Sequence, residues 1–224
     1  GQHSNYREAI DSIFKKIDLS LSTYKPGSVI SKMNRNDTAV RADDYFSEVF
    51  TKSMEVSEKT KGLFDVTVAP VINAYGFGVT RKEKITQPLI DSLLRFVGFK
   101  KVRLDNRKLV KEMPQVMLDF NAIAQGYTVD VLSSFLESRG ISNYLVEVGG
   151  ELRAKGKKED DSYWIVGIEQ PEENNADGVS LNNILIKIKE KSLATSGNYK
   201  KFYIEDGKKY AHIINPFTGY PAMH

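Results

Sequence analysis

The sequence of 224 residues contains no cysteine. This absence excludes a thiolate nucleophile, a disulfide framework, an iron–sulfur cluster and a cysteine-type zinc site, so a metal ion must be held by oxygen atoms or by histidine. Histidine is also scarce: of His3, His212 and His224, His212 is the one that lies away from both ends. Acid–base chemistry near neutral pH therefore depends on His212, or on a carboxylate whose surroundings raise its pKa.

Long apolar runs and an excess of one charge are also missing. No apolar stretch approaches the roughly 18 residues of a membrane-spanning helix, and the first residues lack the pattern of a signal peptide. Lysine and arginine number 32 against 29 aspartate and glutamate, and the two signs are mixed, so we expect no nucleic-acid partner. With 41% hydrophobic residues, the composition is that of a globular chain.

Helical spacing of apolar residues concentrates in the first half of the chain. It predicts helices over Tyr6–Leu21, over Asp43–Lys61 with Gly62 as the stop, and after Thr86-Gln87-Pro88. A further helix, ending at Arg139-Gly140, is predicted to bury the face formed by Ile123, Tyr127, Val131, Phe135 and Leu136.

Strand patterns dominate the second half. The predicted strands are Val102–Leu104, Leu109–Lys111, Gln115–Asp119, Tyr144–Val148, Tyr163–Ile168, Asn183–Lys189, Lys201–Glu205 and Tyr210–Ile214, with a loop over Glu169–Gly178. Helices followed by strands favour an α+β fold, in which helices pack on an antiparallel or mixed sheet.

Two polar segments of the first half are placed at the ends of these elements. Leu21–Tyr24, followed by Ser28 and Asn34, offers an aromatic ring and small polar groups that could stack on a ligand ring and bond its edge; the alternative is a capped turn with a core tyrosine. In Thr60–Pro70, Asp65 interrupts an apolar run. A buried carboxylate needs partners, so Asp65 either binds a ligand or fastens the local backbone.

The segment from Met117 to Asp130 has the sharpest pattern. Asp119 follows a predicted strand and precedes a helix start that contains small residues, which places a carboxylate and free backbone amides together. Such a corner can hold a polar ligand and a hard cation, or Asp119 merely caps the helix. Gly149-Gly150, after the next strand, is a weaker signal and indicates a turn or bulge.

The last segment combines Leu193–Tyr199 with Tyr210–Pro221. His212 is predicted to lie in a strand that leads directly into a turn rich in proline and glycine, so its ring can point into a site. The alternative is a structural histidine whose hydrogen bonds are satisfied within the fold.

Seven ordered segments together resemble the ApbE-type flavin transferases, the FAD:protein FMN transferase family. From about Ile17 to Pro221 these segments read LSTYKPGS, GLFDVTVAP, YGFG, DFNAIAQGYTVD, EVGGE, ATSGNY and HIINPFTGYP. The resemblance implies a single ApbE-type domain over residues 1–224, with helices on a mixed or antiparallel sheet and a T-fold-like core. It also implies a periplasmic, lipid-anchored enzyme that uses Mg²⁺ to transfer FMN from FAD to a Thr or Ser hydroxyl of an acceptor protein and releases AMP.

The resemblance assigns site residues by position. The FAD-binding residues it implies are Tyr24, Leu63, Phe64, Asp65, Asp119, Gln125, His212 and Ile213. Ala122 would give Mg²⁺ a backbone oxygen, and His212 and Asp119 would be catalytic. The implied partners are FAD and acceptor subunits of membrane redox complexes, with membrane contact only through a lipid anchor on the full-length precursor.

The chain departs from the family pattern at several positions. Asn215 and Phe217 stand where many members have Asp and Arg, and Asn121 and Gln125 replace the commoner Gly and Lys, so the site is less charged. We also expect the chain to lack the family's first strand and its C-terminal metal-binding segment. Two alternative functions stay open: an FAD pyrophosphatase that releases FMN and AMP, and a noncatalytic flavin-binding protein.

Overall fold

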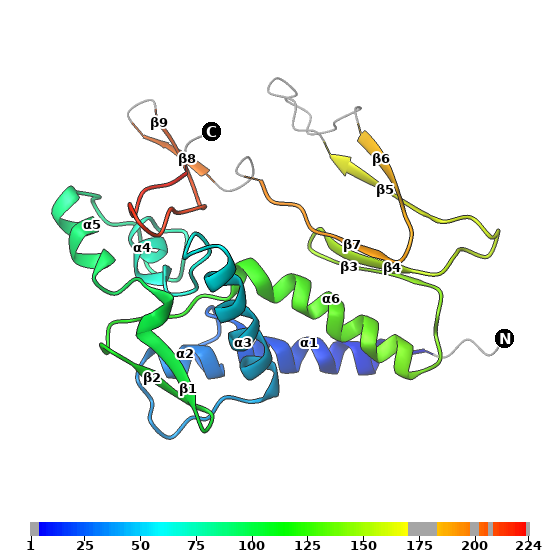
Figure 1. Ribbon diagram of the computed structural model, residues 1–224, viewed down its shortest axis with the longest axis horizontal. Helices are drawn as coiled ribbons and strands as arrows, with labels where there is room; N and C mark the ends of the chain where they lie inside the picture. The colour runs from blue at the N-terminus through cyan, green and yellow to red at the C-terminus, as the bar shows by residue number, and fades with distance from the viewer. Residues whose placement is uncertain (1–4, 170–182, 198–201, 206–207, 223–224) are drawn as a thin grey trace. The chain divides into compact units, whose positions relative to one another are not determined.

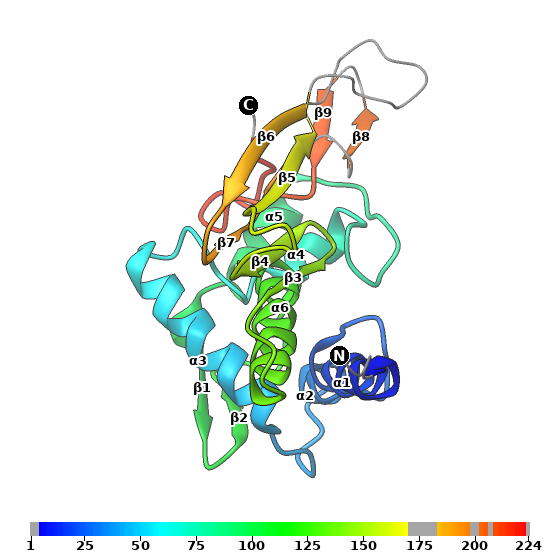
Figure 2. The ribbon, with the colours of Figure 1, turned by 90° about the vertical axis from the view of Figure 1, so that its right-hand side faces the viewer.

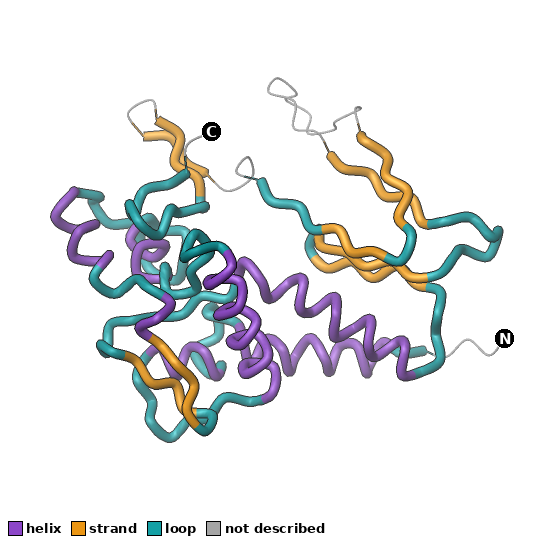
Figure 3. The backbone as a smooth tube through the Cα atoms, viewed as in Figure 1, coloured by secondary structure: helices purple, strands orange, loops and turns teal. Residues whose placement is uncertain are grey.

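The computed structural model describes residues 5–169, 183–197, 202–205 and 208–222. The chain divides into two compact units, residues 1–124 with 200–224 and residues 125–199. Figure 3 shows helices in the first part of the chain and strands in the later part, as the α+β prediction requires. That fold class is confirmed, whereas the single domain over residues 1–224 stays a prediction.

The first unit contains most of the helices (Figure 1). Its elements are α1 Arg7–Leu21, α2 Val29–Asn34, α3 Asp44–Lys59, α4 Ala69–Ala74, α5 Gln87–Leu94, a 3₁₀ turn Phe99–Lys101, and the hairpins β1 Val102–Asp105 with β2 Lys108–Lys111 and β8 Phe202–Glu205 with β9 Lys208–Ala211. Helix α6, Asn121–Ser138, begins in this unit and continues into the second.

The second unit contains the remaining described strands. β3 Tyr144–Val148, β4 Glu151–Lys155 and β7 Lys191–Leu193 form an antiparallel sheet, and β5 Trp164–Glu169 pairs with β6 Asn183–Ile188. Figures 1 and 2 show the β5–β6 pair leading away from the three-stranded sheet. Leu152, Ala154 and Ile188 form the core of this unit.

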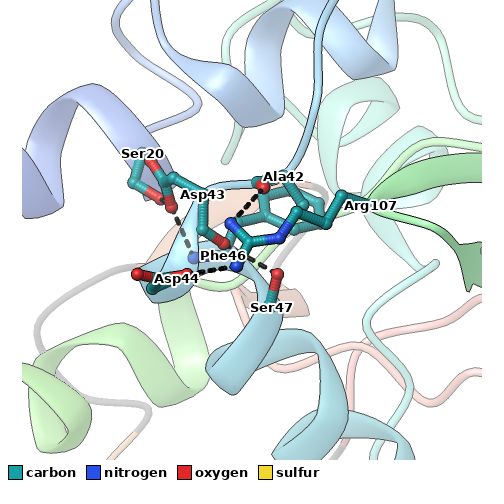
Figure 4. Close-up of polar contacts among 7 residues, drawn as sticks. All are labelled: Ser20, Ala42, Asp43, Asp44, Phe46, Ser47 and Arg107. Carbon is teal, nitrogen blue, oxygen red and sulfur yellow. Dashed lines mark hydrogen bonds and ion pairs between the residues drawn. The ribbon is translucent and has the colours of Figure 1, made fainter.

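A polar cluster at the start of α3 explains why that helix begins where the sequence predicts (Figure 4). Asp43 is the N-cap: its Oδ1 accepts hydrogen bonds from Phe46 N at 2.8 Å and from the buried Ser20 Oγ of α1 at 2.7 Å. Arg107, in the β1–β2 turn, pairs with Asp44 at 2.7 Å. Asp43 thus caps α3 and also joins α1 to α3, while the next residue, Asp44, binds the β1–β2 hairpin through Arg107.

The predicted helices 6–21, 43–61 and after residue 86 are confirmed. Thr86 caps α5 through Leu89 N, and α3 ends at a turn where Gly62 has φ +86°, a conformation that favours glycine. Five short elements were not predicted: α2, α4, the 3₁₀ turn Phe99–Lys101, β4 and β7. Helices of six residues are too short to show a periodic face, so α2 and α4 leave little signal in the sequence.

The predicted strand Gln115–Asp119 is wrong. Only Met117 pairs in strand fashion, through an isolated parallel bridge to Val68. The side chain of Asn34 bonds both backbone groups of Leu118 at 2.8 Å, so no strand can pair there. A tertiary contact with a side chain has replaced the ladder that the sequence pattern indicates.

Two further predictions need correction. β9 ends at Ala211, so His212 lies just beyond the strand and not within it, because Ile214 turns away to bridge Pro221. Helix α6 is confirmed, but its buried residues are Thr128, Val129, Leu132 and Ser133, whereas the predicted apolar face is half-buried. The predicted loop after Glu169 lies outside the described residues, as do His3 and His224.

Candidate functional site

The turn after α1 presents Tyr24 to solvent. Ser28 caps α2 by accepting from Ser31 N at 3.1 Å, and its own hydroxyl donates to Ser22 O at 2.7 Å. These bonds fix the turn, and the Tyr24 side chain remains 56% exposed. The interpretation of Tyr24 as a core residue is therefore wrong, and its ring is accessible for stacking.

Asp65 fastens the backbone of its own segment. Its Oδ1 accepts from Thr67 N at 2.8 Å and from Thr67 Oγ1 at 2.6 Å, while Oδ2 accepts from Phe99 N at 2.7 Å. Asp65 is only 7% exposed, whereas the neighbouring Leu63 is 64% exposed and Phe64 is half-buried. The structural role is confirmed, and contact of FAD with Asp65, Leu63 or Phe64 stays a prediction.

Asp119 lies directly beside this segment. Its backbone N donates to Val66 O at 2.8 Å, which joins the Asp65 and Asp119 segments within the first unit. Its carboxylate accepts from Asn121 N at 2.6 Å and from Asn121 Nδ2 at 3.0 Å, so it covers the first turn of α6. Asp119 thus fixes the first residue of α6, and a half-buried carboxylate at a helix start is also placed to meet a polar ligand, so FAD binding by Asp119 stays a prediction.

The turn after His212 contacts the Asp65 segment as well. Gly62 packs so closely on Phe217 that an added Cβ would lie 3.3 Å from the ring, and Phe217 is itself 61% exposed. His212 is half-buried, and its ring meets Phe77 edge-on at a centroid distance of 6.4 Å. Ile213 O accepts from Ala222 N at 2.8 Å, which closes the turn. The structure thus brings together the second and fourth motif segments.

Gln125 lies in the second unit, on the exposed first part of α6. Gly149 there has φ +62°, and a Cβ at this position would lie 2.0 Å from Gln125 Nε2. Gly150, with φ +106°, donates its N–H to Glu147 Oε1 at 2.9 Å. The glycine pair therefore forms a turn between β3 and β4, as predicted, and leaves room for the Gln125 amide.

A magnesium site has little support among these residues. Ala122, the predicted ligand, is exposed in the first turn of α6. In the part of the chain that the structure describes, no three carboxylate or imidazole side chains gather into a metal-binding group. No described helix is both long and apolar enough to span a membrane.

Sequence reasoning missed what Asn34 and Lys111 do. In the sequence Asn34 is simply a polar residue after Tyr24, yet in the structure it holds Leu118, the neighbour of Asp119. Lys111 donates to four backbone carbonyls of the same region. Burial lowers the pKa of Lys111 to about 8. The one signal in the sequence is a lysine in the predicted strand Leu109–Lys111, and it does not identify the carbonyls that Lys111 contacts.

Comparison with known proteins gives consistent matches. The family model described as ApbE family matches residues 2–224. An FAD:protein FMN transferase of Haemophilus influenzae is 37% identical over 97% of this chain, and one of Vibrio cholerae is 32% identical over 95%. The chain spans 64% of the length of each of these relatives.

Solved structures agree with the sequence matches. The flavin transferase ApbE from Vibrio cholerae has a TM-score of 0.85 and 31% identity, and the match covers 99% of this chain and 70% of that one. The apo flavinyl transferase ApbE of Pseudomonas stutzeri has a TM-score of 0.84 and 30% identity, covering 97% and 67%. The Vibrio cholerae protein has also been solved with one histidine replaced by glycine, at a TM-score of 0.80, 28% identity and coverage of 96% and 67%.

Proposed function

The chain belongs to the ApbE family, and from that premise we propose that it transfers FMN from FAD to a Thr or Ser hydroxyl of an acceptor protein, releasing AMP. The observation that carries this proposal is the hydrogen bond from Asp119 N to Val66 O. It brings the two segments that the family resemblance assigns to FAD into one place, in a chain whose relatives are named FAD:protein FMN transferases.

In the proposed complex, each residue has a role that its environment allows. Exposed Tyr24 stacks on a ring of FAD, and Leu63 with Phe64 gives apolar contact. Asp119 and Gln125 bind polar groups of the nucleotide, and His212 and Ile213 lie beside it. Asp65 contributes chiefly by holding residues 65–67 against residues 98–99, because both of its oxygens already accept hydrogen bonds.

The chemical step is displacement at the phosphorus of the FMN half of FAD. The acceptor hydroxyl oxygen forms a bond to that phosphorus, and the pyrophosphate bond breaks so that AMP leaves with the electron pair. We assign His212 as the base that takes the hydroxyl proton, because imidazole suits this task near neutral pH. A positioned acid–base group contributes roughly 10²–10⁴-fold to rate.

The described residues offer Mg²⁺ few ligands. The Ala122 carbonyl is a hard oxygen donor of the kind Mg²⁺ prefers, but the described residues offer no cluster of further ligands around it. The donor set of the described ranges therefore does not make up a protein-held site for this ion. Mg²⁺, where bound, would supply charge neutralisation for the diphosphate, and none of the roles given to Asp119 and His212 requires it.

Product analysis separates the transferase from the two alternatives. The protein is incubated with FAD and Mg²⁺, with and without a Thr-containing acceptor peptide, and free nucleotides are measured by chromatography. The transferase predicts AMP only with the peptide and no matching free FMN. Equal AMP and FMN without peptide would establish the pyrophosphatase, and FAD that stays bound to the protein and unchanged would establish a noncatalytic flavin-binding protein.

Placement in the cell is proposed on the resemblance alone. We propose a periplasmic enzyme that is anchored by lipid in its full-length precursor and modifies subunits of membrane redox complexes. Fractionation of cells that express the full-length gene, followed by flavin fluorescence of the membrane proteins, tests this placement.

A further inference from the structure

The backbone that leads to Asp119 is held by a side chain. Asn34 Nδ2 donates to Leu118 O at 2.8 Å, and Leu118 N donates to Asn34 Oδ1 at 2.8 Å. Both groups are buried: Asn34 is 9% exposed and Leu118 is 0% exposed. An amide side chain offers one donor and one acceptor side by side, so Asn34 replaces the neighbouring strand that this segment lacks.

A second clamp fixes Asn34 itself. The Lys111 ammonium, on β2, donates to Met33 O and Asn34 O at 3.3 Å each, and to Val116 O at 2.8 Å and Pro114 O at 3.1 Å. The charged residues nearest in sequence to this segment are Glu112 and Asp119, with Lys32 and Arg35 on or beside α2. Within the described ranges, the contacts made by the Lys111 ammonium are with these four backbone carbonyls. Lys111 therefore binds the end of α2 to residues 114–116 through backbone carbonyls.

The opposite side of the segment is also fixed. Asp119 N donates to Val66 O at 2.8 Å, and Phe120, which is fully buried, packs edge-on against Phe46 at 5.2 Å. The Asp119 carboxylate then accepts from Asn121 N at 2.6 Å. The position of the Asp119 carboxylate therefore depends on a backbone that Asn34 holds at Leu118 and that Val66 holds at Asp119.

We propose that Asn34 is a positioning residue for Asp119, acting through the two hydrogen bonds to Leu118. The inference rests on the proposed function, in which Asp119 binds FAD. Without the amide, Leu118 loses both partners, and the segment can shift relative to α6. A displacement of about 1 Å at a binding group can cost on the order of 10²-fold.

The variant N34D makes the proposal testable through pH. Its ionised carboxylate can accept from Leu118 N but cannot donate to Leu118 O, whereas the protonated acid can do both. Burial against a carbonyl raises the pKa of the introduced carboxyl. We therefore expect FAD binding by N34D to be roughly tenfold weaker than wild type at pH 8 and to recover toward wild type as the pH falls to about 5.

FAD affinity is measured by fluorescence titration at constant ionic strength, with circular dichroism at each pH to confirm the folded state. The control is N36G, because Asn36 Nδ2 donates to Pro114 O at 3.1 Å in the same segment without touching Leu118, and glycine accepts the φ of +64° at this position. N36G is expected to bind FAD like wild type at every pH. A constant ratio of wild-type to N34D affinity across this range would overturn the proposal.

A double-mutant cycle covers the case in which N34D fails to fold. N34S keeps a small hydroxyl and loses the paired geometry. If Asn34 acts through Asp119, N34S weakens FAD binding in the wild type. In a D119A background, the same change should raise the dissociation constant for FAD by less than twofold. Independent, multiplying losses would overturn the inference and leave the proposed function standing. Failure of the wild type to bind FAD would overturn both.

Discussion

Replacing Asp65 tests whether its carboxylate holds the site together. Three donors converge on it: Thr67 N, Thr67 Oγ1 and Phe99 N, at 2.8, 2.6 and 2.7 Å. Thr67 Oγ1 in turn accepts from Gly98 N at 2.7 Å, so the threonine hydroxyl must donate its proton to Asp65. The carboxylate thus completes a chain of bonds from residue 98 to residue 65.

The expected cost follows from this geometry. D65A leaves two backbone N–H groups and one hydroxyl without their acceptor in a site that is 7% exposed. An unsatisfied buried donor costs about 1–3 kcal/mol, and water entering the space offsets part of it, so we expect D65A to lower the free energy of unfolding by about 3 kcal/mol. D65N keeps the shape of the side chain but turns an NH₂ group toward either Phe99 N–H or Thr67 N–H. We therefore expect D65N to lower the free energy of unfolding by about 2 kcal/mol.

Urea denaturation followed by circular dichroism measures both losses. The matched control is D105A, because Asp105 is an exposed aspartate of the same unit that bonds only the neighbouring Asn106 side chain among its described contacts. D105A is expected to change stability by less than about 0.5 kcal/mol. A D65A protein as stable as D105A would refute the structural account of this carboxylate.

Three further predictions concern single side chains. H212A should slow FMN transfer by roughly 10²-fold or more while FAD still binds, as measured by acceptor modification; unchanged turnover would move the base role to a carboxylate. G149A places a Cβ 2.0 Å from Gln125 Nε2 at a φ of +62°, so it should weaken FAD binding more in the wild type than in a Q125A background, where only the backbone strain remains; equal losses in both would contradict this contact. Burial lowers the pKa of Lys111 from 10.5 to about 8, so between these pH values the unfolded chain holds a proton that the folded protein has released. The free energy of unfolding of the wild type should therefore rise with pH relative to that of K111M. We expect a rise of about 1–2 kcal/mol between pH 8 and 10 after allowance for solvent screening. Parallel stability curves in urea for the two proteins would contradict that assignment.

The helices that sequence reasoning located correctly are those with local signals. Asp43 and Thr86 act as caps for α3 and α5, and Gly62 ends α3 with a positive φ. Each of these signals lies within a few residues of the feature it controls, so the sequence alone is sufficient. The apolar spacing of α1 belongs to the same class.

The errors arise where distant residues decide. The strand pattern before Asp119 is real, but Asn34, 84 positions away, takes the hydrogen bonds that a partner strand would have formed. The buried face of α6 is shifted by its surroundings to Thr128, Val129, Leu132 and Ser133, which no apolar periodicity marks. Asp65 illustrates the limit of a motif: the sequence predicts that the carboxylate has partners, and only the structure names them.

The central claim is transfer of FMN to a protein hydroxyl, and the intact mass of the acceptor tests it most directly. A Thr-containing acceptor peptide is incubated with this chain, FAD and Mg²⁺ and then weighed, beside a matched peptide with Val in place of Thr. The account predicts that the Thr peptide gains the mass of one FMN less one water, that the Val peptide gains nothing, and that D119A abolishes the gain. An unmodified Thr peptide in the presence of bound FAD would contradict the account.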